Sequence, residues 1–458
     1  MNETILAIDI GSTKICAILA EVQNGIVTIQ GHGISKSQGV KKGIINNIEL
    51  SSKSIKKAIN DAKRIAGSNI STAIVSISNA YAKSITSTGI VNIPNNEISM
   101  KEISRVMQTA LYNANVPNEY DVIHVLPYNF RVDDQDSIED PFGMNASRME
   151  ADVNIIMTQK SNLLNLQKAV RLAGIEIDGI VLSGYASAIA TMDADEKELG
   201  VAVLDLGGQT SNLVVHLGNS IRYNSFLGVG SNHITNDLSM ILHTPLQVAE
   251  NVKIRFGNLI ESSDETIDLP IIGDENSSNT ISMEMIHSVI FSRVEEALMI
   301  LSKSLDNSNI KEQIGAGIIL TGGMTKLKGI RELAQAIFTG IPVRVGYPDN
   351  INGFFNELKD PTFSTVIGLL QYKAGKHTQY EINFQEELLH SKIFREENLS
   401  DIKINNPMDN IKVNSPKDIP SINNNGSETT ILFDDLPDLG SENKKSFKKL
   451  ANWARQLF

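Results

Sequence analysis

The sequence predicts an α/β protein built from two related halves, because two of its segments share one pattern and helical patterns follow each of them. The segments are ILAIDIGSTKICAILAEVQNGIVTIQGHG and GVAVLDLGGQTSNLVVHLGNSIRYNSFLGVG. Each reads as an apolar strand, Asp-x-Gly, a small polar turn, a second strand, an Asn-Gly or Gly-Asn turn and a third strand. Asp9 and Asp205 lie almost half the chain apart, which indicates the duplication of a three-strand meander.

The helical patterns place apolar residues at spacings of three and four, and most of them end at glycine. The predicted helices cover 50–67, 160–174, 244–257 and 285–305. A third αβ unit follows at 315–346, where an apolar strand runs into Gly-Gly and then into a helix. Strands mixed with crossover helices are typical of an α/β protein.

The composition narrows the classes of function. A net charge of −12 argues against general nucleic-acid binding, because no basic surface is large enough to compete with it. Cys16 is the one cysteine and lies in the apolar run ICAILA, so we expect a core residue and a chain suited to a reducing cytoplasm. The N-terminal sequence lacks the pattern of a signal peptide, and no window of 18 uncharged apolar residues predicts a membrane span.

The end of the chain differs from the rest. Residues 391–442 are rich in Asn, Ser, Asp, Pro and Lys without a sustained period, which predicts a flexible linker. Residues 443–458 predict an amphipathic helix with an apolar stripe and a basic face. Either this helix packs on the body of the protein, or it lies in the plane of a membrane with its cations on anionic lipid. The candidate membrane-binding residues are Lys444, Lys445, Phe447, Lys448, Lys449, Leu450, Trp453, Arg455, Leu457 and Phe458.

The two Asp-Gly turns have the composition of phosphate-binding loops, although one such turn alone is more often just a hairpin. Small residues let backbone N–H groups approach an anion closely, and a lysine in the first turn adds a cation. Asp9 and Asp205 stand at strand ends, where each could hold a hydrated Mg²⁺. The candidate phosphate-binding residues are Gly11, Ser12, Thr13, Lys14, Gly207, Gly208, Gln209 and Thr210.

The segment LTGGMTKLKGI at 320–330 is an apolar strand that runs into a glycine turn, which can lay flat backbone against a base or a ribose. Together with the two matched hairpins it resembles the actin, Hsp70 and sugar-kinase superfamily, whose ribonuclease H-like halves hold ATP in the cleft between them. Segments 181–192 and 363–372 resemble the helices that connect these halves. The resemblance implies that Glu250, Lys253, Gly322, Gly323 and Met324 bind adenosine; for Glu250 and Lys253 the alternative is a solvated helix face.

Further segments resemble one family within the superfamily, FtsA, the bacterial cell-division homologue of actin. They include GHGISKSQGVKKGIINNIE, VIHVLPYNF, RMEADVNIIMTQKSNLLNLQKAVRLAGIEIDGIVLSGYASA, DADEKELGVAVLDLGG and GAGIILTGGMTKLKGI, and the resemblance covers about residues 1–390. It implies an inserted 1C (SHS2) subdomain at 84–161, for which the sequence predicts a helix at 100–113 and strands at 121–132 and 149–159. The other implied parts are subdomain 1A at 1–83, 162–195 and 361–390, subdomain 2A at 196–233 and 306–360, and subdomain 2B at 234–305.

The resemblance also implies a function: an ATP-binding protein that polymerises on the cytoplasmic face of the inner membrane at the division site. It implies that subdomain 2B binds the C-terminal peptide of the tubulin-like protein FtsZ, that 1C recruits later division proteins, and that residues 443–458 are the membrane anchor. Arg293 matches a basic position at the FtsZ site; the alternative is a structural arginine with a buried stem.

ATP turnover is expected to be slow or negligible. Relatives with ATPase activity carry a glutamate or glutamine at the start of the first connecting helix, where this chain has Ser183 and Gly184. Attack on the terminal phosphate needs a group that orients water. Gln209 stands where many relatives have a third glycine, and it either crowds the terminal phosphate or replaces the missing polar group.

Three other classes of protein with a similar fold fit the sequence less well. A sugar or acetate kinase of the same fold would need a catalytic aspartate and a substrate pocket, without a linker and a basic tail. A chaperone of the Hsp70 type would need a β domain after residue 390. PilM, a relative in pilus assembly, shares the insertion, and the extended 2B region and the basic tail argue against it.

Overall fold

The computed structural model describes residues 3–390, except residues 219, 350 and 354 and the side chains of 274–276. The predicted linker at 391–442 and the predicted amphipathic helix at 443–458 lie outside the described residues.

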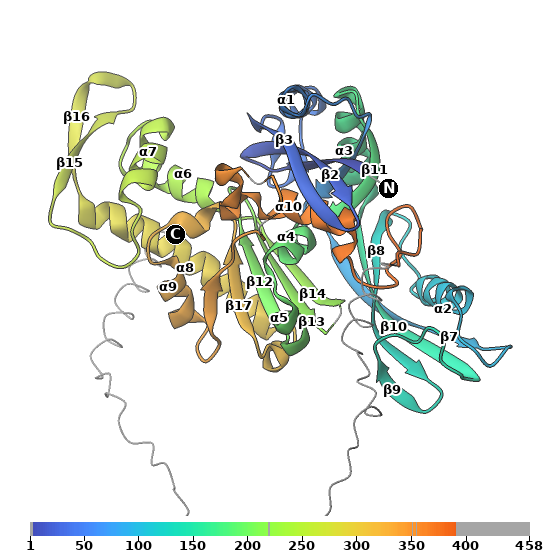
Figure 1. Cartoon of the computed structure of the whole chain (residues 1–458). Helices are drawn as coiled ribbons and strands as arrows, with labels where there is room; N and C mark the ends of the chain where they lie inside the picture. The colour runs from blue at the N-terminus through green and yellow to red at the C-terminus, as the bar shows by residue number, and fades with distance from the viewer. Residues whose placement is uncertain (1–2, 219, 350, 354, 391–458) are drawn as a thin grey trace, which may run out of the picture. The chain divides into compact units, whose positions relative to one another are not determined.

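The first half of the chain forms a five-stranded sheet in the order β11-β6-β1-β2-β3 (Figure 1). Strands β1 and β2 pair antiparallel, as do β2 and β3, whereas β6 and β11 run parallel to β1. The buried residues of β1, β2, β6 and β11 are mostly Ile, Val, Leu and Ala, as expected for strands covered on both faces, whereas β3 alternates between buried and more exposed positions. The bounds are β1 Glu3–Ile10, β2 Lys14–Gln23, β3 Ile26–Lys36, β6 Thr72–Ile77 and β11 Glu176–Leu182.

The second half repeats this topology in a sheet of order β14-β13-β12-β17-β18, which confirms the predicted duplication. Its first three strands form the antiparallel meander, and β17 and β18 follow in parallel. The bounds are β12 Val201–Leu206, β13 Ser211–Leu217, β14 Ser220–Leu227, β17 Gly317–Thr321 and β18 Val343–Val345.

Helices α4 (Ser183–Thr191) and α10 (Ser364–Gln371) pack against each other, with α4 also against β12 and β13 and α10 against β1 and β2 (Figure 1). A side chain at Gly368 would place its Cβ 1.7 Å from the carbonyl oxygen of Ala186, so only glycine permits this approach. Both helices fall within the segments predicted to connect the halves.

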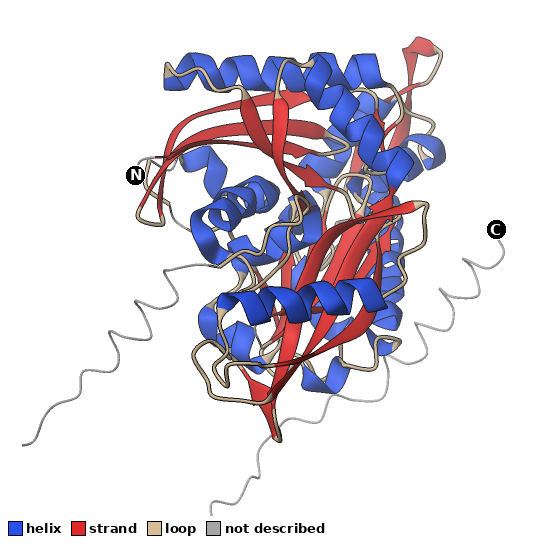
Figure 2. Cartoon of the chain, turned by 90° about the vertical axis from the view of Figure 1, so that its right-hand side faces the viewer, coloured by secondary structure: helices blue, strands red, loops and turns tan. Residues whose placement is uncertain are grey.

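An insertion after the first half's central strands forms a separate sheet in the order β7-β10-β8-β9. Helix α2 lies across one face of this sheet (Figure 2), and Gly89 lets it come close, since a Cβ there would be 2.1 Å from Val106 O. The predicted helix and the two long strands of this region are confirmed. The bounds are β7 Lys83–Asn92, α2 Met100–Asn113, β8 Tyr120–Val132, β9 Gln135–Ile138 and β10 Arg148–Gln159.

The remaining helices cover the sheets, and those at the four predicted segments are confirmed to within a few residues. A hairpin of β15 (Thr266–Ile271) and β16 (Asp274–Ser282) and the helix α6 (Ser231–Ile241) were not predicted. The other bounds are α1 Ile48–Ala66, α3 Lys160–Leu172, α5 Ala194–Leu199, α7 Leu246–Phe256, α8 Met283–Asp306 and α9 Ile330–Ile337, with a short ribbon of β4 Val40–Lys41 and β5 Ile44–Ile45.

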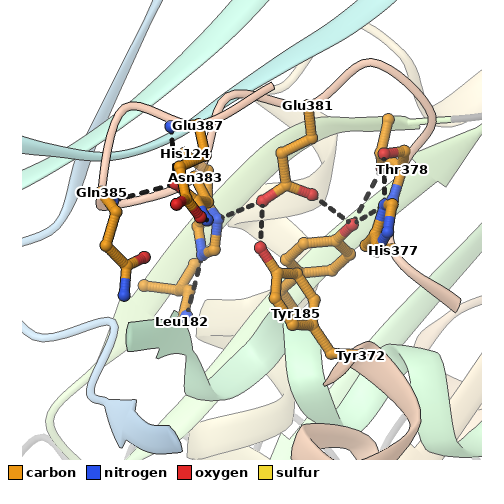
Figure 3. A network of polar contacts seen from close by, with 10 residues as sticks. All are labelled: His124, Leu182, Tyr185, Tyr372, His377, Thr378, Glu381, Asn383, Gln385 and Glu387. Carbon is orange, nitrogen blue, oxygen red and sulfur yellow. Dashed lines mark hydrogen bonds and ion pairs between the residues drawn. The ribbon is translucent and has the colours of Figure 1, made fainter. Parts of the chain in front are cut away.

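A fully buried carboxylate, that of Glu381, joins the last described segment to the first half and to the insertion (Figure 3). It accepts hydrogen bonds from the hydroxyls of Tyr372, at 2.7 Å, and Tyr185, at 3.1 Å, and lies 2.6 Å from Nδ1 of His124. The backbone N–H of Leu182 donates to Nε2 of the same histidine at 3.1 Å, which places the ring proton on Nδ1, directed at Glu381. Three donors from distant parts of the chain therefore converge on one buried carboxyl group.

Replacing Glu381 with alanine should lower the free energy of unfolding by at least about 3 kcal/mol, because three buried donors lose their acceptor. Chemical denaturation followed by circular dichroism measures the change. The exposed Glu119 provides the control, since Glu119→Ala should leave stability nearly unchanged. Equal stability of the two variants would show that the Glu381 network does not hold this region together.

Candidate functional site

A cavity of about 410 Å³ lies where the carboxyl ends of β1 and β12 approach each other, the usual place for a ligand at parallel strands. Both Asp-Gly turns line it, together with the glycine turn after β17, one side of α7 and the start of α4. The cavity brings together nearly all the predicted nucleotide-site residues: Asp9, Gly11, Ser12, Thr13, Lys14, Asp205, Gly207, Gly208, Thr210, Glu250, Lys253, Gly322, Gly323 and Met324.

The two turns are held in shape by hydrogen bonds and touch each other. In the second turn the N–H of Gly207 donates to Thr210 O at 2.8 Å, and the N-terminus of α6 donates to the carbonyls of Gly207 and Gly208. In the first turn Ser12 Oγ accepts from the N–H of Gly43 at 2.8 Å. A Cβ on Gly208 would lie 2.1 Å from the methyl carbon of Thr13, so a side chain there would have to displace Thr13 where the turns meet.

Lys14 lines the cavity as a buried cation with no hydrogen-bond partner for its Nζ among the described residues. The Nζ lies 3.3 Å from the ring centroid of Phe363, which partly compensates its charge. Burial lowers the pKa of the Lys14 ammonium. An anion in the cavity would supply the partner that the protein lacks, which fits a phosphate group.

Two carboxylates, Asp9 and Asp205, face the same cavity. Burial raises the pKa of Asp9, and burial raises the pKa of Asp205 to about 6. Each accepts a hydrogen bond from a serine hydroxyl: Ser76 Oγ donates to Asp9 Oδ1 at 2.9 Å, and Ser187 Oγ donates to Asp205 Oδ2 at 2.8 Å.

These two carboxylates fit a divalent cation that keeps most of its waters. Among the described residues, no group of three or more His, Cys, Asp or Glu side chains could enclose a metal ion. Mg²⁺ is commonly bound through one or two carboxylates plus substrate phosphates, and the donor set of the cavity matches that need.

Lys253, on α7, is buried rather than solvated, so the alternative of a solvated helix face does not hold for it. Its Nζ donates to Glu250 Oε2 at 2.7 Å, to Thr235 Oγ1 at 2.9 Å and to Ser231 O at 3.2 Å. In the glycine turn after β17, which also lines the cavity, Gly322 has a φ of 86°, and a Cβ there would lie 2.5 Å from Asp205 Oδ1. Only glycine can take this position.

The start of α4 offers no carboxylate or carboxamide side chain that could orient water. Ser183 lines the cavity, but its Oγ donates to Ile77 O at 2.9 Å. The N–H of Gly184 donates to Asn79 Oδ1 at 2.9 Å, and a Cβ there would lie 2.7 Å from Val214. Gln209 is absent from the cavity lining, and its Oε1 instead accepts from the backbone N–H of Lys42 at 2.8 Å. The structure therefore does not place Gln209 with the other predicted phosphate-binding residues.

Arg293 lies on α8, away from the cavity, and is half-buried. Its Nε contacts Asp237 Oδ2 of α6 at 2.5 Å, and its Nη1 contacts Glu296. The hydrogen bond to Asp237 raises the pKa of the Arg293 guanidinium. These contacts agree with a structural arginine, and any acidic ligand at this position would compete with Asp237.

Several residues that line the cavity were not predicted from the sequence: Asn212, Ser231, Lys326 and Thr365. The internal duplication gave no signal for Asn212, because its equivalent in the first meander, Cys16, follows Asp9 at the same distance but does not line the cavity. The predicted membrane-binding residues of 443–458 lie outside the described residues, and no helix within the described part is long and apolar enough to cross a membrane.

Comparison with known families and relatives gives one consistent result. Residues 202–368 match the model of the cell division protein FtsA, and residues 79–157 match the SHS2 domain inserted in FtsA. The cell division protein FtsA of Helicobacter pylori is 42% identical over 83% of this chain and 84% of the relative. That of Pseudomonas aeruginosa is 35% identical over 82% of this chain and 91% of the relative. That of Escherichia coli is 30% identical over 84% of this chain and 94% of the relative.

Solved structures show the same fold. The chain is similar to a PilM–PilN type IV pilus biogenesis complex, with a TM-score of 0.58, 17% identity, and coverage of 81% of this chain and 98% of the other. It is also similar to MreB5 of Spiroplasma citri bound to AMPPNP, with a TM-score of 0.51, 13% identity, and coverage of 87% of this chain and 98% of the other. The predicted actin-like fold with an inserted SHS2 subdomain is confirmed.

Asp205→Asn should stabilise the protein without ligand at pH 7.5 by up to about 3 kcal/mol. Because the folded-state pKa of about 6 exceeds the ordinary 3.8, the wild-type carboxyl favours folding at low pH and loses that contribution as the pH rises from 3.8 to 6. Denaturation midpoints measured from pH 4 to 7.5 test this.

The exposed Asp134 gives the matched control, since Asp134→Asn should not change the pH profile. A less stable Asp205→Asn variant at pH 7.5 would contradict the burial of an unfavourable charge.

Proposed function

Because this chain belongs to the FtsA family of cell-division proteins, we propose that it is an ATP-binding, actin-like division protein that polymerises on the cytoplasmic face of the inner membrane, tethers FtsZ there and recruits later division proteins. The observation that supports ATP binding is the cavity between the duplicated turns, where Lys14 Nζ has no hydrogen-bond partner among the described residues. The fold's duplicated halves supply the frame for such a site.

ATP would lie with its phosphates between the two turns. The backbone N–H groups around Gly11, Ser12 and Gly208 would approach the phosphate oxygens, and Lys14 would neutralise charge beside them. Asp9 and Asp205 would hold the waters of a Mg²⁺ ion, whose positive charge offsets that of the phosphates.

The nucleoside would lie between α7 and the turn after β17. Glu250 already accepts from Lys253, so its carboxylate is oriented to receive the hydroxyls of a ribose. Gly322, Gly323 and Met324 would provide a flat surface for the base.

The proposed membrane binding rests on the sequence of residues 443–458. Near an anionic leaflet each cation contributes about 1 kcal/mol, so the five cations Lys444, Lys445, Lys448, Lys449 and Arg455 give reversible binding. Polymerisation would strengthen this through avidity, because many tails would then act from one filament.

We assign the binding of the FtsZ C-terminal peptide to residues 234–305 and the binding of later division proteins to residues 84–161. Arg293 can present a guanidinium to an acidic peptide only by giving up part of its pairing with Asp237. That competition favours modest affinity for the peptide and easy release.

Purified protein should bind ATP and turn it over much more slowly than actin-like proteins that are active ATPases. The reason is the absence of a water-orienting side chain at Ser183 and Gly184. Equilibrium binding of labelled ATP and phosphate release measured together test both statements. Turnover comparable to that of active relatives would contradict the proposal, and loss of that turnover in Gln209→Gly would identify Gln209 as its source.

Co-sedimentation with anionic vesicles in ATP, with a labelled FtsZ C-terminal peptide present, tests the tethering role. The full chain should carry the peptide into the pellet. A chain ending at Glu442 should bind the peptide in solution and stay with it in the supernatant.

Arg293→Ala gives the reciprocal control: it should pellet with vesicles and leave the peptide behind. If the chain ending at Glu442 pellets as well as the full chain, the closing segment is not the anchor. If Arg293→Ala carries as much peptide as the full chain, the assigned FtsZ site is wrong.

A further inference from the structure

A second cavity, of about 310 Å³, lies at the C-terminal end of α10. Its walls come from the turn between β2 and β3, from the segment that follows β18, and from the end of α10 with the residues after it. None of the described residues that line it lines the first cavity, although Thr365 at the start of the same helix does. No role given above uses this second cavity.

One side chain that lines the second cavity, Gln371, has a buried polar atom without a partner. Gln371 is 3% exposed, and its Nε2 donates to Asp349 Oδ2 at 3.0 Å. Because a carboxylate only accepts, this bond fixes which end of the amide is the nitrogen. The amide oxygen, Oε1, has no hydrogen-bond partner among the residues that the structure describes. Buried amide oxygens are almost always paired, so Oε1 requires a donor from outside these residues.

The neighbouring carboxylate, that of Asp349, has a partner that can be replaced. Lys376 Nζ donates at 3.0 Å to the same oxygen that accepts from Gln371. The Lys376 side chain is 53% exposed, so it can leave this contact at little cost. Lys197 also lies near this pair without lining the cavity, so an incoming cation would displace Lys376 rather than join it. The amide oxygen and the carboxylate both accept hydrogen bonds, which favours a cation with N–H donors over an anion.

The remaining walls suit an apolar stem. Ile26, Val27 and Ile351 line the cavity, and Ile26 is 59% exposed. The residues after α10 form a π turn, Tyr372–Lys376, and such turns are rare and frequently occur at functional sites. An alkyl chain could lie along the isoleucines while its charged end reaches the amide oxygen.

We propose that the second cavity binds an alkylammonium group, whose N–H donors pair with Gln371 Oε1 and with the Asp349 carboxylate in place of Lys376. Two sources carry this chemistry: a free polyamine and the lysine side chain of a polypeptide. The net charge of −12 favours association with either. The inference stands apart from the proposed nucleotide binding, because it uses none of the residues that line the first cavity.

Titration calorimetry of the full chain with cadaverine and with Nα-acetyl-lysine methylamide tests the inference. The first probe is a free diamine, and the second presents a lysine side chain on a peptide backbone. At least one of them should bind in a one-to-one complex. Gln371→Met should weaken this binding about tenfold, because a hydrogen bond to a charged group is lost. Lys376→Met should strengthen it, because the competing ammonium is removed.

The matched control is Gln108→Met on α2, which changes an exposed glutamine of the insertion and should keep the wild-type affinity. Lys376→Met alters an exposed side chain, so it keeps the test decisive if Gln371→Met does not fold. With these variant effects, binding of either probe supports the inference, and the tighter probe identifies the source of the ammonium group. If neither probe binds, if Lys376→Met weakens binding, or if folded Gln371→Met binds as well as Gln108→Met, the inference is wrong.

Discussion

The site depends on how closely α4 and α10 pack, since these two helices connect the sheets whose strand ends form the cavity. Their backbones touch where Gly368 meets Ala186, and no side chain fits between them. Ser187 of α4 bonds both to Thr365 of α10, at 2.9 Å, and to Asp205, at 2.8 Å. The Ser187 hydroxyl therefore bonds both to the partner helix and to a site carboxylate. This couples the packing of the helices to the geometry of the site.

The cavity holds several groups that the protein itself does not satisfy. Lys14 lacks a partner among the described residues, Asp9 and Asp205 have pKa values raised by burial, and Asn212 Oδ1 is unpaired there as well. Such groups lower the stability of a folded state without ligand, and a ligand that satisfies them restores it. A ligand at 100 times its Kd adds about 2.7 kcal/mol. A ligand that satisfies these groups, such as the proposed nucleotide, would therefore stabilise the folded structure as well as occupy the cavity.

The sequence was most informative where a signal is local. The Asp-Gly turns and the helical periods act over a few residues, and the structure confirms the meander, its duplication and the helices of 50–67 and 285–305. Contacts between distant residues carried no such signal. Glu381 meets His124 across 257 positions, and Gln209 turns to the backbone of Lys42. The β15–β16 hairpin was missed because β16 (DENSSNTIS) has a single apolar residue and therefore shows no alternation, although β15 (TIDLPI) does alternate.

The absence of a water-orienting group at the start of α4 is built into the packing and is not a matter of one missing side chain. Gly184 lies against Val214, and its N–H is held by Asn79, so a glutamine or glutamate there would have to displace a buried strand residue. Restoring the chemistry would require changes at several contacting positions at once, whose effects would not add. In the proposed role, nucleotide binding would suffice without hydrolysis, because a polymer subunit of that kind needs its two halves held in one arrangement, and a bound ligand favours one arrangement over others.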